Sequence, residues 1–78
     1  MNEYRTKDFY LAVLLETEGY RLDSSYKTPE GIYFVFEVLD EIKLAKILSD
    51  FLNYKAMVNM RRFTSSIVKI RKEIEKHK

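Results

Sequence analysis

A turn sequence between two strand-like segments most constrains what this chain can fold into. Residues 28–31 read Thr-Pro-Glu-Gly, where proline presets φ and glycine accepts positive φ. Side chains alternate through residues 20–27 before the turn, and residues 32–38 after it are rich in aromatic and β-branched side chains, which is typical of strands. The sequence therefore predicts a β-hairpin. An isolated hairpin is only marginally stable in water, so helices must cover it or another chain must pair with it.

Three helical patterns accompany the hairpin and set the fold class. Thr6 is suited to cap a first helix over residues 7–18, which Gly19 ends. Asp40 and Asn59 are suited to cap two further helices. The sequence predicts an α+β fold in the order helix, hairpin, helix, helix (α-β-β-α-α), with residues 55–58 as a possible short third strand.

The composition indicates one small domain that is held together by aromatic packing. The chain has 78 residues and no cysteine, so residues 1–78 are expected to form a single domain without a disulfide or a thiolate metal site. Six Tyr and five Phe supply large apolar side chains for the core. The longest apolar run, Phe9 to Leu15, is too short to span a bilayer. The start of the sequence has no signal-peptide pattern, so we expect a cytoplasmic protein without a membrane partner.

The last helix carries the clearest pattern in the chain. Its apolar residues recur at spacings of three and four, which is one face of a helix: Met60, Phe63, Ile67, Ile70 and Ile74. We interpret this stripe as a core seam within the chain, with a dimer seam as the alternative. The opposite face is polar and carries a single sign of charge: Arg61, Arg62, Ser65, Lys69, Lys72 and Lys76.

The charge of the chain is unevenly distributed and adds to this pattern. Residues 1–40 hold four basic and eight acidic side chains, for a net charge of −4, whereas residues 41–78 hold ten basic and four acidic, for +6. Two arginines in the first turn of a helix oppose the helix dipole unless an anion lies nearby. DNA, RNA or another anion is one candidate partner of this face, through Arg61, Arg62, Lys69, Lys72 and Lys76. The alternative is a solvated face, with Arg61 or Arg62 paired to an acid such as Asp50.

The hairpin offers a second candidate surface. Ile32, Phe34, Phe36 and Val38 alternate along one face of the second strand, which leaves Tyr33 and Val35 on the other. This pair is unusually apolar for a face in contact with water, and it predicts an interaction patch for a host or viral protein. A structural homodimer through the hairpin edge or the last helix is a further alternative.

No catalytic or metal-binding constellation is recognisable. His77 is the only histidine, and Ser24-Ser25 and Ser65-Ser66 have no companion base in the sequence. Two glycines are too few for a phosphate-binding glycine loop. We therefore expect a binding protein that is not an enzyme and that carries no metal or cofactor.

The order of these features resembles a family of small uncharacterised domains found in bacteriophages, prophages and some bacteria and archaea. The resemblance covers nearly the whole chain and rests on capping and packing residues: Thr6-Lys7-Asp8, Leu11-Ala12, Gly19-Tyr20, Tyr33-Phe34-Val35-Phe36, Phe51, Val58 and Phe63. It implies a phage-type accessory protein that originates on a mobile element. It implies no known activity and no site residues.

Overall fold

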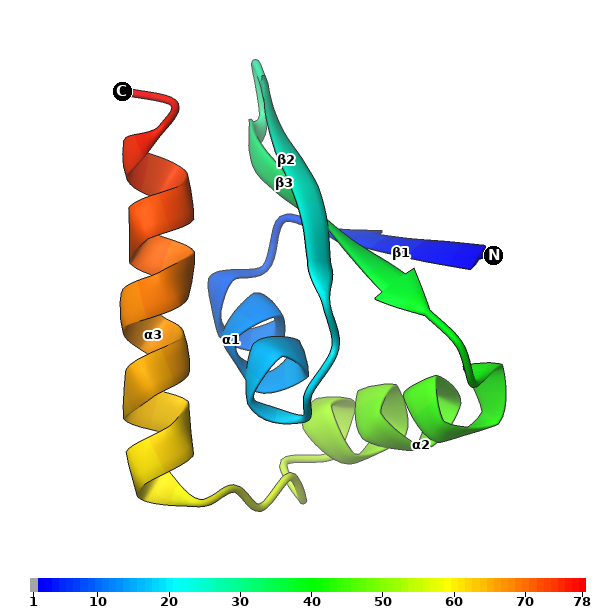
Figure 1. Ribbon diagram of the computed structural model, residues 1–78. Helices are drawn as coiled ribbons and strands as arrows, with labels where there is room; N and C mark the ends of the chain where they lie inside the picture. The colour runs from blue at the N-terminus through cyan, green and yellow to red at the C-terminus, as the bar shows by residue number, and fades with distance from the viewer. Residues whose placement is uncertain (1) are drawn as a thin grey trace.

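A computed structural model describes residues 2–78 and contains three strands and three helices (Figure 1). The elements follow one another as β1 (Asn2–Thr6), α1 (Phe9–Thr17), β2 (Leu22–Thr28), β3 (Gly31–Val38), α2 (Glu41–Leu52) and α3 (Met60–Glu75). The predicted α+β class is confirmed, and the predicted hairpin and three helices are all present. The order is β-α-β-β-α-α because one strand precedes the first helix.

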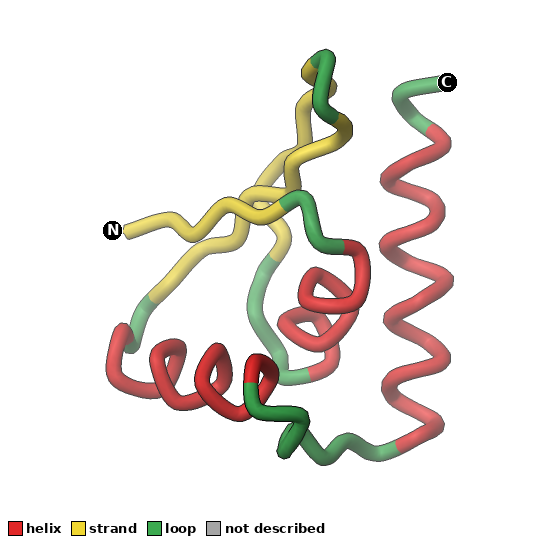
Figure 2. The backbone as a smooth tube through the Cα atoms, turned by 180° about the vertical axis from the view of Figure 1, so that it is seen from behind, coloured by secondary structure: helices red, strands yellow, loops and turns green. Residues whose placement is uncertain are grey.

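The sheet has three antiparallel strands in the order β1-β3-β2, with β3 in the centre. The strand that the sequence analysis did not predict is β1, in which Tyr4 lies opposite Phe36 of β3. The prediction of a third strand at residues 55–58 is wrong, because these residues form an irregular connection between α2 and α3. Figure 2 shows that this connection lies at the far end of the molecule from the hairpin turn.

A β-bulge changes which side chains of β2 face the core. Leu22 lies opposite Phe36 and Ser24 lies opposite Val35, so the register shifts between Leu22 and Ser24. A bulge places two residues of one strand opposite one residue of its partner and therefore resets the alternation. Ser25 consequently shares a face with Leu22, whereas simple alternation predicted Ser24 there.

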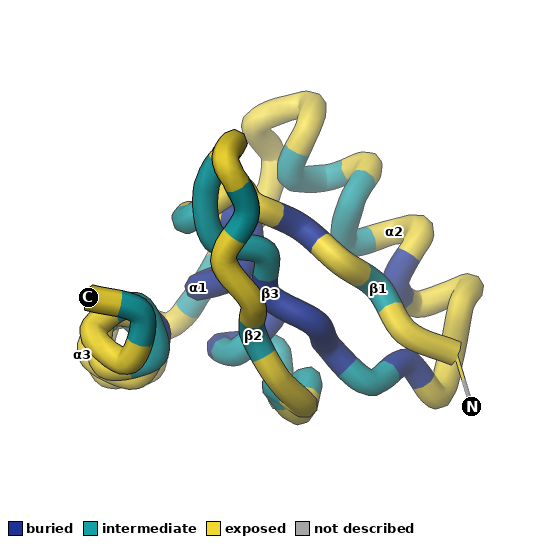
Figure 3. Tube along the Cα trace, turned by 90° about the horizontal axis from the view of Figure 1, so that it is seen from above, coloured by how far each residue is buried: buried dark blue, intermediate teal, exposed yellow. Residues whose placement is uncertain are grey.

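Helix α1 lies at the centre of the core. Five consecutive residues of α1, Leu11–Leu15, are buried, which is the pattern of a helix covered on all sides. Phe34 and Phe36 of β3 and Ile70 of α3 belong to the same buried cluster. In the view from above, α1 lies beneath the strands, with α3 on one side and α2 on the other (Figure 3).

Each helix begins at a polar side chain that accepts backbone hydrogen bonds. Asp40 Oδ1 accepts from the amides of Ile42 and Lys43, and Asn59 Oδ1 accepts from that of Arg62, as predicted for these two caps. The cap of α1 is Asp8 and not Thr6, because Asp8 Oδ1 accepts from the Leu11 amide at 3.0 Å. Thr6 Oγ1 instead accepts from the Asp8 amide, so it supports the cap.

The predicted interaction patch of Tyr33 and Val35 on the sheet is wrong for Val35. Val35 lies on the face of β3 opposite the core cluster, yet it is only 4% exposed. Its register partners on the two outer strands are Arg5 and Ser24. Tyr33 is half-buried and stacks on Tyr26 with ring centroids 5.5 Å apart. Val35 therefore offers no surface to a partner, and Tyr33 offers only part of its ring.

Candidate nucleic-acid interface

An open groove of about 710 Å³ runs between α3 and the segment that joins α1 to β2. Five cationic and two acidic side chains line this groove. The cations are Arg21, Arg62, Lys69, Lys72 and Lys76, and the acids are Glu16 and Glu73. We call it the basic groove. Four of the five cations predicted from the last helix therefore lie together, joined by an arginine from outside that helix.

The α3 wall of the groove is a straight row of cations. Arg62, Lys69 and Lys76 are spaced by seven residues, or two helical turns. At 1.5 Å per residue, the row from Arg62 to Lys76 spans about 21 Å. Lys72 lies beside this row on the same wall. Arg61 is exposed but does not line the groove.

Only part of the positive charge is neutralised within the chain. Lys69 Nζ lies 3.2 Å from Glu16 Oε1, and Lys76 Nζ lies 3.0 Å from Glu73 Oε1. Arg62 and Lys72 form no ion pair with any carboxylate of residues 2–78. The alternative prediction that Asp50 pairs with Arg61 or Arg62 is wrong, because Asp50 pairs with Lys46 on its own helix.

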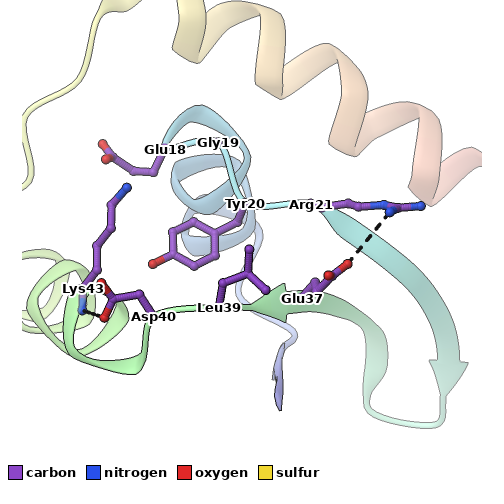
Figure 4. Close-up of a pocket in the computed structure, with 8 residues that line it drawn as sticks. All are labelled: Glu18, Gly19, Tyr20, Arg21, Glu37, Leu39, Asp40 and Lys43. Carbon is purple, nitrogen blue, oxygen red and sulfur yellow. Dashed lines mark hydrogen bonds and ion pairs between the residues drawn. The ribbon is translucent and has the colours of Figure 1, made fainter. Parts of the chain in front are cut away.

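The opposite wall comes from the short joint after α1. Gly19 has a φ of +92°, which a side chain with a Cβ rarely adopts, so glycine permits the sharp turn here. Tyr20, Arg21 and Leu22 follow it and line the groove. Figure 4 shows that the Arg21 side chain extends away from the Tyr20 ring. Arg21 reaches Glu37 only at 4.0 Å and is 81% exposed, so its guanidinium is free to contact a ligand.

A polar network at the end of the groove ties β2 to α3. Ser25 Oγ donates to Glu73 Oε2 and lies 2.7 Å from His77 Nε2. The hydrogen bond from Ser25, together with the charge of Lys76, lowers the pKa of the Glu73 carboxyl against the opposing effect of burial. Sequence reasoning missed this contact because Ser25 and His77 lie 52 residues apart. Only the bulge in β2 turns Ser25 toward the helix.

A smaller hollow of about 290 Å³ shares the same joint and lies on the side of α2 (Figure 4). The buried Tyr20 hydroxyl has no hydrogen-bond partner within residues 2–78. Burial raises the pKa of Tyr20, and the nearby carboxylates of Asp40 and Glu18 raise it further. Lys43 Nζ lies 6.0 Å from the centre of the Tyr20 ring. Three acids and two bases line this hollow, so it has no single sign of charge.

The connection between α2 and α3, together with the helix residues that flank it, exposes several large apolar side chains. Four of them are 72–97% exposed: Leu52, Tyr54, Met57 and Met60. Tyr54 has a φ of 57°, an uncommon value for a residue other than glycine. We call these four residues the apolar loop. It is a larger exposed apolar surface than the pair of Tyr33 and Val35 on the sheet.

Residues 2–78 contain no group of three or more His, Cys, Asp or Glu side chains arranged to hold a metal ion. None of the helices described combines the length and the apolar character needed to cross a membrane.

Comparison with known proteins gives one match. The family model described as Domain of unknown function (DUF5659) matches residues 1–76. No curated protein and no solved structure matches the chain.

Proposed function

The chain belongs to the DUF5659 family of unknown function, and from this premise we propose that it is a non-catalytic protein that binds the phosphate backbone of a nucleic acid in its basic groove. The phage or prophage origin implied by the sequence resemblance is part of the same proposal. A small accessory protein of a mobile element would work in the presence of that element's nucleic acid.

The observation that carries the proposal is the row of cations along α3. Lys69 and Lys76 keep 65% and 69% of their side chains exposed even though each pairs with an acid. Arg62 and Lys72 have no such pair among residues 2–78 and are exposed as well. Phosphate contacts need positive charge at repeated spacing and require no sequence code. A row of about 21 Å is long enough to meet several phosphates of one strand.

A salt titration tests the proposal directly. The fluorescence anisotropy of labelled DNA is measured with increasing protein at several salt concentrations. We expect binding at low salt with a log–log slope that reports the number of phosphates contacted. The variants Arg62→Ala and Lys72→Ala should each weaken binding and reduce the slope. The matched control is Arg71→Ala, which removes an exposed cation of α3 that does not line the groove. Absence of binding to any nucleic acid at low salt would contradict the proposal.

A protein–protein role is the second candidate, and the apolar loop is the observation that favours it. Its four exposed apolar side chains lie within nine consecutive residues, and exposed apolar surface of this kind often marks an interaction site. The candidate partners are a host or viral protein or a second copy of this chain. Sedimentation of the protein at increasing concentration tests self-association, with Tyr54→Ser and Met57→Ser as variants that should abolish it. A chain that sediments as a monomer at every concentration excludes the homodimer.

A further inference from the structure

We infer that the basic groove takes a single strand of nucleic acid and not a duplex. This inference rests on the proposed function and names the form of nucleic acid that the site recognises. It follows from where the cations lie relative to the two walls of the groove.

The first argument is that positive charge faces the groove from both sides. Arg62, Lys69, Lys72 and Lys76 belong to α3, whereas Arg21 comes from the joint between α1 and β2. A single strand that lies in the groove contacts both walls at once. Proteins that bind single strands combine such a positively charged groove with side chains that contact the bases.

The second argument concerns the rest of the groove lining. Tyr20 and Leu22 line the same groove next to Arg21. The Tyr20 ring points to the α2 side of the joint, where its hydroxyl is buried (Figure 4), so Leu22 supplies the apolar surface next to Arg21. Leu22 is only partly buried, and its exposed part can contact the face of an unpaired base without requiring a particular base sequence. In a duplex the bases are stacked inside, so this side chain has no base face to contact.

The third argument is that the outward side of α3 is poorly suited to a duplex. A helix that reads a duplex enters the major groove, which is about 12 Å wide, and must present its outward face to the DNA. On α3 that face carries Val68 and Glu75 beside Arg61. Val68 is 49% exposed. Glu75 is exposed and forms an ion pair with Lys78. The acid on this face therefore offsets Arg61, whereas the groove has five cations against two acids.

Two arginines give a matched pair of variants that separates the two forms of binding. Arg21 lies on the wall opposite α3, and Arg61 lies on α3 outside the groove. Both are exposed, so neither substitution by alanine removes a buried contact, and circular dichroism checks that both variants keep the fold. Binding of the whole chain is measured by anisotropy with an oligothymidylate and with a duplex of the same length at low salt.

We expect the oligothymidylate to bind more tightly than the duplex. Arg21→Ala should weaken its binding as much as Arg62→Ala does and should lower the magnitude of the salt slope by about 0.7, the value for one phosphate contact on a single strand. Arg61→Ala should leave both quantities unchanged. Tighter binding to the duplex, or dependence on Arg61 without dependence on Arg21, would overturn this inference while the proposed function stands. Absence of binding to both DNAs would overturn the proposed function, and this inference with it.

Discussion

Ser25 Oγ of β2 donates a hydrogen bond to Glu73 Oε2 of α3, which connects two residues 48 positions apart in the sequence. The same carboxylate accepts a hydrogen bond from Lys76 Nζ at 3.0 Å. Glu73 therefore joins the hairpin to the end of α3 and also positions one cation of the basic groove. A single serine hydroxyl thus supports both the packing of α3 and the arrangement of the candidate site.

Removal of that hydroxyl should lower the stability of the fold. Ser25→Ala leaves the Glu73 carboxylate without the hydrogen bond that contributes most to its lowered pKa, and hydrogen bonds to charged groups contribute about 1.5–3 kcal/mol. Because this pair is only partly buried, we expect a loss of about 1 kcal/mol in the free energy of unfolding, measured by urea denaturation. Ser24→Ala is the control, since Ser24 is exposed on the outer face and should change stability little. Equal effects of the two variants would contradict this role for Ser25.

The acid stability of the protein should depend on Glu73. The pKa of its carboxyl in the folded state lies below the ordinary value of 4.5. Its contribution to stability is therefore fully present above pH 4.5 and is lost as the pH falls through the lowered folded pKa. We expect Glu73→Gln to destabilise the protein at neutral pH and to converge with the unsubstituted chain in acid. Urea midpoints across the acid range measure this difference, and a gap that stays constant would argue against it.

Substitution of Tyr20 by phenylalanine should be neutral or stabilising at neutral pH. Its buried hydroxyl has no partner among residues 2–78, and a buried unsatisfied polar group costs about 1–3 kcal/mol. Tyr20→Phe should also improve stability at high pH. The folded pKa is raised above 10.0, so the hydroxyl makes the fold less stable as the pH rises past that value, where the unfolded chain ionises first. Thermal unfolding at neutral and alkaline pH checks both statements, and a clear loss of stability at neutral pH would show that the hydroxyl has a partner.

The attachment of α3 to the core should depend on Ile70. This side chain is 0% exposed and belongs to the central cluster with α1. Truncation of a buried isoleucine to alanine costs about 2–5 kcal/mol, so Ile70→Ala should unfold at much lower urea concentration. Val68→Ala is the matched control on the same helix, because Val68 is 49% exposed and should cost little. Similar urea midpoints for the two variants would mean that α3 does not pack as described.

Local patterns were sufficient to predict most of the elements and one wall of the candidate site. The turn at residues 28–31 predicted the hairpin, and the apolar spacing from Met60 to Ile74 predicted α3 together with its basic face. Both signals depend on neighbours within a turn or two of each other. The caps at Asp40 and Asn59 were predicted for the same reason, since a cap acts only on the next few residues.

Features that depend on distant contacts could not be predicted in this way. Strand β1 has only one apolar residue, Tyr4, among its five, and it becomes a strand because β3 supplies its hydrogen-bonding partners. Arg21 lies in a separate element from the cations of α3, so no periodicity connects them. The bulge between Leu22 and Ser24 shifts which side chains face the helices, and its sequence signal is weak.

The central position of α1 has a consequence for how the protein is made. Its five consecutive buried residues are covered partly by β3 and partly by α3, which follows the other five elements in the chain. Until α3 leaves the ribosome, one side of α1 remains exposed to water and to other nascent chains. The fold can therefore be completed only after α3 has left the ribosome, and a product cut short before Ile70 would be a substrate for chaperones and proteases.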